Sequence, residues 1–171
     1  TGDVYYTALG ISAVCTAIAA TLIVRQGRTA AVMATGLVLL GTSRAFTTYA
    51  TSGLENPLVF CLLAAFAATF LRGGHPARRL FWLSLWAALL GTTRMDTLVL
   101  VLPGLAVAAW PLRWRQAAIP GVLGFLPFLA WVGFATFYYG TPFPSTAYAK
   151  AIAVDLPRVP LLREGVHFLL D

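Results

Sequence analysis

The sequence predicts an all-α protein, a polytopic transmembrane helical bundle of about six spans. Hydrophobic residues make up 59 % of the 171 residues, and charged residues make up only 11 %. A soluble domain of this length needs a larger charged surface. The apolar residues also form long runs, and several runs meet or approach the roughly 20 residues that a membrane-spanning helix needs. We therefore expect a multi-pass protein of the cell membrane.

The predicted spans alternate with short polar loops. Residues 4–24 form the first span, and residues 29–46 form the second after the basic loop RQGR. Residues 57–71 form a short third span, in which Pro57 suits the first helical turn. Residues 117–137 form the last span.

Residues 80–110 require two helices instead of one. A single straight helix of this length would measure about 46 Å at about 1.5 Å per residue, whereas a hydrocarbon core is about 30 Å thick. Its middle would also hold Arg94 and Asp96, which are costly at the bilayer centre. Two helices that meet at the sequence GTTRMD avoid this cost. They also place all three basic loops on the cytoplasmic side, as the positive-inside rule requires.

Residues 1–171 are expected to form a single transmembrane domain, because the sequence contains no visible repeat and no low-complexity segment. The chain begins at Thr1 and shows no signal peptide, so we interpret it as an internal fragment of a longer protein. The tail from Asp155 to Asp171 carries apolar residues at partly helical spacing. It fits either an amphipathic helix along the outer interface or the approach to a further span.

The predicted topology places uncommon polar residues on the outward side. The outward loops are TTYATSGLEN, GTTRMD and YYGTPFPSTAYAK. The ionisable side chains in these loops or at the adjacent helix ends are Arg44, Glu55, Arg94, Asp96 and Lys150. Arginine and lysine suit phosphate because they supply positive charge and several donors. Acids suit sugar hydroxyls, a divalent cation or the arginines themselves. We therefore predict a site for a charged ligand at this surface.

Each of these side chains also has an ordinary structural explanation. Arg44 can end a helix and extend its side chain to the interface. Arg94 and Asp96 can neutralise each other across a tight turn. Glu55 can be a solvated loop residue, and Tyr139 is typical of the aromatic side chains at a membrane interface. For the Arg94 and Asp96 pair, the structural and functional explanations are equally supported.

Several function classes lack support in the sequence. The net charge of +6 comes from arginines in short loops, and the absence of a basic stripe with interleaved aromatics argues against nucleic-acid binding. The sequence contains no Walker A loop, dinucleotide-binding turn, nucleophile elbow or zinc-ligand spacing. His75 and His167 lack matching ligands nearby, so we predict no metal site. Cys15 and Cys61 lie within apolar runs and are typical of small core residues.

Three segments, taken in order, resemble a known family. They are SRAFTTYATSGLENPL, TTRMDTLVLVLPGL and FYYGTPFPSTAYAK. Together they resemble the multi-span glycosyltransferases of the GT-C fold, and most of all the actinobacterial arabinofuranosyltransferases that add terminal residues to the cell wall. The resemblance implies a polyprenyl-phosphate sugar donor, a cell-envelope glycan acceptor on the outer face, and contact with membrane lipid. No cofactor is implied with certainty, although the acids are compatible with a divalent cation.

The resemblance also implies roles for individual residues. Such transferases use an acidic general base in the first outward loop, and this chain has no such loop with an aspartate pair, so we expect the catalytic residue upstream of Thr1. Positively charged side chains near the outward loops are expected to bind the donor phosphate, and the acids are expected to shape the sugar or acceptor pocket. The first group is Arg44, Arg94 and Lys150, the second is Glu55 and Asp96, and weaker candidates are Asn56, Tyr139 and Ser145.

Two other functions remain open from the sequence. One is a flippase for a lipid-linked glycan, or another transporter, which would place polar groups along a path through the membrane. The other is a non-catalytic membrane scaffold. An acidic residue directly after an initial span upstream of this chain would favour the enzyme over both alternatives.

Overall fold

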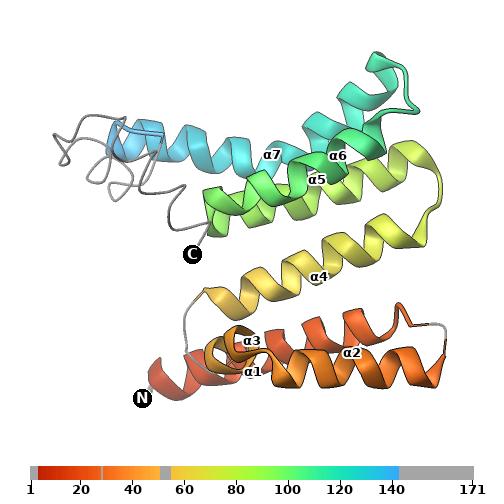
Figure 1. The fold of residues 1–171 in the computed structure, drawn as a ribbon. Coiled ribbons are helices and arrows are strands. Elements are labelled where there is room, and N and C mark those ends of the chain that lie inside the picture. Colours follow the sequence, from red (N-terminus) through yellow and green to blue (C-terminus); the bar gives the residue numbers. More distant parts are fainter. Residues whose placement is uncertain (1–3, 28, 51–54, 143–171) are drawn as a thin grey trace, which may run out of the picture. The chain divides into compact units, whose positions relative to one another are not determined.

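The computed structural model describes residues 4–27, 29–50 and 55–142 of the chain, and these ranges contain helices and turns but no strand. The chain divides into two compact units, Thr1–Leu129 and Ala130–Asp171. The helices are labelled in Figure 1. In chain order they are α1 (Val4–Val24), α2 (Ala30–Thr42), α3 (Arg44–Tyr49), α4 (Asn56–Arg72), α5 (Pro76–Thr93), the short 3-10 helix η1 (Met95–Thr97), α6 (Leu98–Ala109) and α7 (Trp114–Tyr139).

The predicted all-α class is confirmed for the described residues, and so is the predicted break within residues 80–110. Helix α5 ends at Thr93, and Arg94 adopts an extended conformation with φ −149° and ψ 113°. The turn of η1 follows, and α6 then begins at Leu98. The two charged residues of GTTRMD therefore lie between the α-helices α5 and α6, and Asp96 is the middle residue of η1.

Two predicted boundaries were wrong. Residues 29–46 form two helices instead of one, because Ser43 is extended and its side-chain oxygen accepts a hydrogen bond from the backbone N–H of Phe46 at 3.4 Å. This contact caps a new helix, so α2 ends at Thr42. Helix α5 starts at Pro76, four residues earlier than expected, because proline is favoured at the first position of a helix.

Two of the described helices, Tyr6–Val24 and Trp114–Tyr139, are long and apolar enough to cross a membrane. The segments Ala30–Thr42, Asn56–Arg72 and Met95–Ala109 are apolar but shorter. Length and composition therefore support a membrane-associated chain. The count of six spans and the GT-C-like arrangement stay predictions.

The core of the first unit lies between α4, α5 and α6. Leu83 and Leu90 of α5 are completely buried at its centre. Helix α2, in contrast, has no buried residue. The buried hydrophobic cluster consists of Val59, Leu62, Phe66, Leu80, Leu83, Ala87, Leu90, Val101, Leu105 and Ala108.

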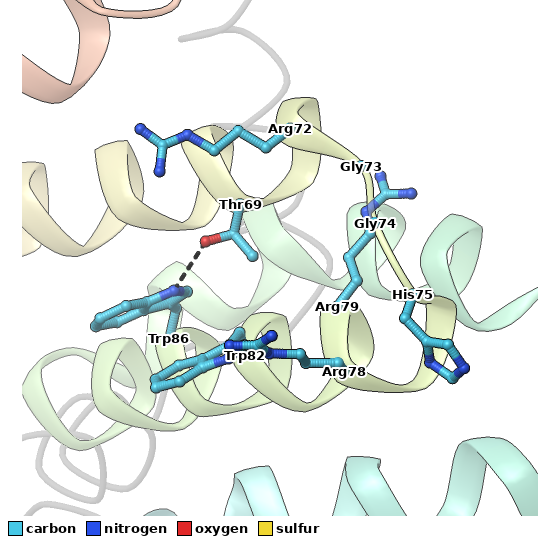
Figure 2. A pocket seen from close by; sticks show the side chains of 9 residues that line it. All are labelled: Thr69, Arg72, Gly73, Gly74, His75, Arg78, Arg79, Trp82 and Trp86. Atoms are coloured by element: carbon cyan, nitrogen blue, oxygen red, sulfur yellow. Dashed lines mark hydrogen bonds between the residues drawn. The ribbon is translucent and has the colours of Figure 1, made fainter.

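Helices α4 and α5 form an antiparallel hairpin, which gives the first unit two chemically different ends (Figure 1). At one end α4 begins and α5 finishes. At the other end a short turn joins Arg72 to Pro76. Near this turn the indole Nε1 of Trp86 donates a hydrogen bond of 3.0 Å to the Oγ1 of Thr69, which links the two helices (Figure 2).

The first half of α7 approaches α5 closely through glycine. A Cβ atom on Gly124 would lie 2.6 Å from the carbonyl oxygen of Phe81 and 2.6 Å from the Cβ of Ser84. A Cβ atom on Gly91 of α5 would lie 3.0 Å from the ring of Phe128. Small residues at such crossings allow helix backbones to pack at short distance.

Candidate functional site

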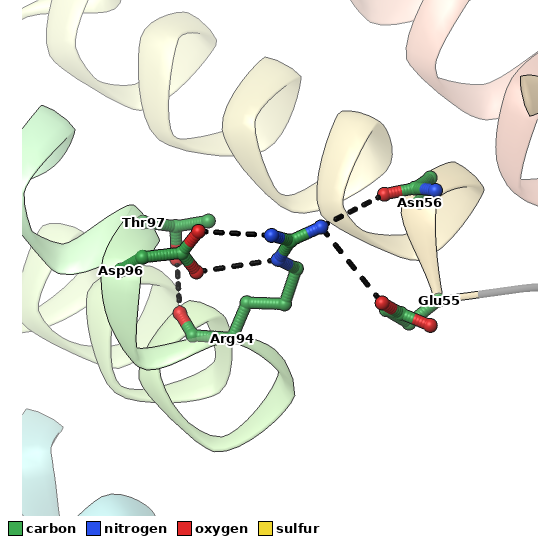
Figure 3. A network of polar contacts seen from close by, with 5 residues as sticks. All are labelled: Glu55, Asn56, Arg94, Asp96 and Thr97. Carbon is green, nitrogen blue, oxygen red and sulfur yellow. Dashed lines mark hydrogen bonds and ion pairs between the residues drawn. The ribbon is translucent and has the colours of Figure 1, made fainter. Parts of the chain in front are cut away.

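The structure brings together four of the residues predicted to form a binding site. Glu55, Asn56, Arg94 and Asp96 lie at the end of the hairpin where α4 begins and α5 finishes (Figure 3). Lys150, a fifth predicted residue, lies outside the described part of the chain, as does the weaker candidate Ser145. We call the four residues the polar network.

Local backbone structure explains why the polar network forms. Arg94 has an extended backbone between α5 and η1, so its side chain is not held in the direction that a helix would impose. The turn is closed by Thr97, whose hydroxyl donates a hydrogen bond of 2.6 Å to the carbonyl oxygen of Arg94. Asn56 is the first residue of α4, and Glu55 precedes it. The antiparallel hairpin places this helix start opposite the turn.

Arg94 is the centre of the polar network. Its Nε and Nη2 donate hydrogen bonds to the two carboxylate oxygens of Asp96, at 3.2 and 2.9 Å. Its Nη1 donates to the Oδ1 of Asn56 at 3.3 Å, across 38 residues of sequence. The same nitrogen lies 3.8 Å from the Oε1 of Glu55. Arg94 therefore joins the α5–α6 turn to the start of α4, and the pairing with Asp96 that the sequence suggested is confirmed.

The charges of the polar network do not cancel. One guanidinium and two carboxylates leave one excess negative charge at neutral pH. All three nitrogens of the Arg94 guanidinium have partners. Nε and Nη2 contact Asp96, and Nη1 contacts the residues at the start of α4. The carboxylate of Glu55 has only the long contact and is about half exposed. The available groups are therefore acceptors, which suit the hydroxyls of a sugar better than a phosphate.

The contact between Arg94 and Asp96 also fixes their charge states. The hydrogen bonds from Arg94 lower the pKa of the Asp96 carboxyl below its ordinary value. Reciprocally, the carboxylate raises the pKa of Arg94. Both directions favour the ion pair, so the two side chains stay charged at neutral pH.

This pair predicts a small pH dependence of stability. A carboxyl whose pKa is lowered by folding stabilises the protein above its unfolded pKa, about 3.9 for aspartate, and loses that contribution as the pH falls through the folded pKa. Both side chains are well exposed, at 41 % and 67 %, so we expect Asp96→Asn to cost at most about 1 kcal/mol at pH 7. The difference in unfolding free energy should shrink as the pH falls below about 3.9 and through the lowered pKa of Asp96 in the folded protein. Circular dichroism can follow the unfolding of both proteins in detergent at pH 7 and in acid. An equal difference in unfolding free energy between Asp96→Asn and the unmodified protein under both conditions would contradict the prediction.

Arg44, unlike Arg94, forms no ion pair with the described residues. It is the exposed first residue of α3, and its side chain has no hydrogen-bond or ion-pair partner among the described residues. Helix α3 packs on the first part of α4, since the rings of Phe46 and Phe60 lie 5.4 Å apart. Arg44 therefore belongs to the same region of the first unit in which α4 begins.

Tyr139 lies in the second unit, at the end of α7, and is not part of the polar network as described. Its ring packs edge to face on Tyr138, with centroids 4.8 Å apart. It also meets the edge of Phe134, at 6.3 Å. This aromatic cluster agrees with the ordinary interfacial explanation for Tyr139.

An apolar pocket of about 280 Å³ lies between α1, α2, α3 and α4. Its walls include Phe46 of α3 and Phe60 and Leu63 of α4. Phe60 is four residues beyond Asn56, about 6 Å along the helix. The pocket wall therefore begins about one helical turn from the polar network, and its apolar lining offers a surface for hydrocarbon.

Comparison with known proteins adds no family to this description. No family model, curated protein or solved structure matches the chain. The chemical interpretation therefore depends on the residues and their geometry. Among the described residues there is also no group of three or more histidine, cysteine, aspartate or glutamate side chains that could hold a metal ion.

The sequence analysis missed a second polar feature, at the turn between α4 and α5. It assigned the segment RGGHPARR to a basic loop that sets the topology. In the structure Arg78 and Arg79 lie on the first turn of α5, one helical turn before Trp82 and two before Trp86. The four-residue spacing of these arginines and tryptophans on one helix face is the sequence signal that could have indicated a pocket.

Proposed function

We propose that the chain is part of a multi-pass membrane glycosyltransferase with a GT-C-like fold. It transfers a sugar from a polyprenyl-phosphate donor to a cell-envelope glycan on the extracytoplasmic face. The candidate sugar is arabinofuranose. The polar network carries this proposal. Two segments separated by 38 residues converge on one cluster of acceptors and one guanidinium, at the end of helices that are otherwise apolar.

In this function the polar network binds the sugar. Carboxylate and amide oxygens accept hydrogen bonds from sugar hydroxyls. Arg94 is a positioning residue, because its bidentate contact holds the carboxylate of Asp96 in one orientation. Glu55 is the least constrained acid and lies at the exposed edge of the cluster. It therefore has the most freedom to meet a bound sugar or acceptor.

The donor phosphate requires positive charge that the polar network does not supply. We assign this role to Arg44, which has no anionic partner among the described residues, and to Lys150, which the family resemblance implies. This assignment shifts Arg94 from phosphate binding to positioning. It follows from the excess negative charge around Arg94, which disfavours a further anion.

The donor is lipid-linked, and two features support contact with its hydrocarbon chain. The apolar pocket between α1 and α4 is lined by residues in the middle of α4, beginning at Phe60. Large apolar side chains are also exposed on the helices, including Leu39, Val99 and Phe137, and exposed apolar surface of this kind suits lipid. In the transfer step an acidic general base, which the family resemblance implies, takes the proton of the acceptor hydroxyl. That oxygen then bonds to the sugar as polyprenyl phosphate leaves.

The test uses the full-length protein in lipid nanodiscs, a polyprenyl-phosphate pentose as donor, and separate measurements of donor binding and turnover. Arg44→Ala and Lys150→Ala should each weaken donor binding at least about tenfold, because each removes a charge-assisted contact. Arg94→Lys keeps a charge but loses the planar fork, so it should lower turnover by about tenfold or more with little change in donor affinity. Arg115→Ala, which removes an exposed charge from the first turn of α7, is the control.

Two results would overturn these assignments. Unchanged donor affinity in both Arg44→Ala and Lys150→Ala would reject the phosphate role. Normal turnover in Glu55→Gln would remove Glu55 from the site. Movement of the donor across the membrane without transfer of its sugar would indicate a flippase in place of a transferase.

A further inference from the structure

An open pocket of about 480 Å³ lies at the turn between α4 and α5 (Figure 2). Its walls come from the last turn of α4, the connecting turn and the first half of α5. The side chains that define its chemistry are Arg72, His75, Arg78, Arg79, Trp82 and Trp86. Helix α4 has 17 residues, so the connecting turn lies about 25 Å along this helix from the polar network. The two features are therefore separate sites.

The positive charge of this pocket has no internal counterion. Three arginines line it, and none of its lining residues is acidic. In the described part of the chain the acidic residues are Glu55 and Asp96, and both lie at the opposite end of the hairpin around Arg94. Arg72 and Arg78 have no hydrogen-bond or ion-pair partner for their side chains among the described residues. Like charges that line one pocket repel each other, and an anion from outside the chain would offset the repulsion.

Arg79 is held in place by the end of α4. Its guanidinium lies over the ring of Phe70, 4.6 Å from the ring centroid, and its Nη2 donates a hydrogen bond to the carbonyl oxygen of Phe70. Its Nε is buried and has no hydrogen-bond partner among the described groups. These contacts orient the guanidinium without neutralising its charge. A fixed arginine of this kind loses less conformational entropy when it binds a phosphate.

The backbone of the turn adds a further preference for anions. Gly73 and Gly74 have φ values of 68° and 117°, which only glycine adopts readily, and this conformation lets the chain turn sharply into α5. His75 precedes α5 but its side chain makes no capping hydrogen bond. The N-terminus of the 18-residue helix α5 therefore adjoins the pocket without a side-chain cap. The positive end of its dipole favours an anion there.

Part of the pocket wall is aromatic. The rings of Trp82 and Trp86 are stacked with centroids 6.1 Å apart, and the hydrogen bond from Trp86 to Thr69 fixes the inner ring against α4. The ring of Trp82 is 38 % exposed. Indole rings are enriched where acyl chains meet head groups. A cationic rim beside an aromatic wall therefore suits an amphiphile with a phosphate head.

We propose that this pocket binds the phosphate head group of an anionic membrane phospholipid. The three arginines hold the phosphate, the start of α5 faces the same negative charge, and the tryptophan pair contacts the adjoining glycerol and acyl region. This site is independent of the proposed sugar transfer, because it lies at the other end of the hairpin and shares no residue with the polar network.

The test measures lipid preference at the tryptophan pair. The full chain carries Trp110→Phe, Trp114→Phe and Trp131→Phe, so that Trp82 and Trp86 remain as reporters, and it is placed in phosphatidylcholine nanodiscs. Brominated phosphatidylglycerol or brominated phosphatidylcholine is then added at equal mole fraction, and quenching of fluorescence is recorded. We expect the anionic lipid to quench at the lower mole fraction.

Matched double variants separate a site from general attraction. Arg72→Gln with Arg78→Gln removes two exposed charges from the pocket, and we expect the preference for the anionic lipid to fall at least about tenfold. Arg113→Gln with Arg115→Gln removes two exposed charges at the start of α7 and should leave the preference intact. Both pairs are exposed, so folding should be retained, as circular dichroism will show. Replacing Arg72 and Arg78 with lysine should preserve most of the preference.

Two outcomes would overturn the proposal. An equal loss in both glutamine double variants would show that the arginines attract anionic lipid only through general charge. Displacement of the quencher by millimolar inorganic phosphate would show a site for free phosphate, and the lipid assignment would then be wrong. Retained preference in the presence of inorganic phosphate supports the lipid.

Discussion

Replacing Leu83 with alanine is expected to lower the free energy of unfolding by about 2–5 kcal/mol. Leu83 is completely buried in the cluster between α4, α5 and α6. The substitution removes buried methyl groups and leaves a cavity that the surrounding helices fill only in part. The substitution destabilises the α4–α5 hairpin, which positions both the polar network and the pocket at the turn between α4 and α5. Ligand binding at both sites should therefore weaken together.

A matched substitution provides the control for Leu83. Leu100 lies on the neighbouring helix α6 and is 68 % exposed. Leu100→Ala removes the same atoms from a surface position, so the expected change is within about 0.5 kcal/mol. Thermal unfolding of both variants in one detergent gives the comparison. Similar losses at the two positions would contradict the packing described here.

Replacing Gly124 with alanine is expected to destabilise the contact between α7 and α5 by about 1–3 kcal/mol. The new Cβ would lie 2.6 Å from the carbonyl oxygen of Phe81 and 3.0 Å from the backbone nitrogen of Leu85. Backbone atoms inside a helix cannot move out of the way alone, so one whole helix must shift. The gain in helix propensity, about 1 kcal/mol for glycine to alanine, offsets only part of this cost.

Gly121 tests this explanation within the same helix. Nothing lies within 4 Å of the position that its Cβ would occupy. Gly121→Ala should therefore keep the gain in helix propensity and be neutral or stabilising. The unfolding midpoint should therefore fall in Gly124→Ala and stay the same or rise in Gly121→Ala. A shift of the same sign and size in both would mean that α7 does not approach α5 at Gly124.

Much of the helical structure could be predicted from local sequence. The first predicted span has the same bounds as α1, Val4–Val24. The break between α5 and α6 was predicted from the length of a single helix and from the cost of Arg94 and Asp96 at the bilayer centre. Their ion pair was predicted as one of two explanations for these residues. These features depend on neighbouring residues alone, so a single sequence can reveal them.

Other boundaries depended on contacts that the apolar pattern does not reveal. Ser43 ends α2 because its side chain caps the next helix, whereas the hydrophobic run continues past it. Pro76 starts α5 before the apolar run begins. In both cases capping and backbone preference, and not hydrophobicity, determine the helix end.

The sequence by itself determined that the described residues fold as apolar helices with charged turns, because run length and turn residues act locally. Only the tertiary structure decided which turns face each other. The antiparallel register of α4 and α5 brings Asn56 to Arg94 across 38 residues and leaves Arg72 and Arg78 together at the opposite end. Side-chain packing between helices sets that register. It depends on pairs of residues far apart in the chain, which composition and periodicity do not encode.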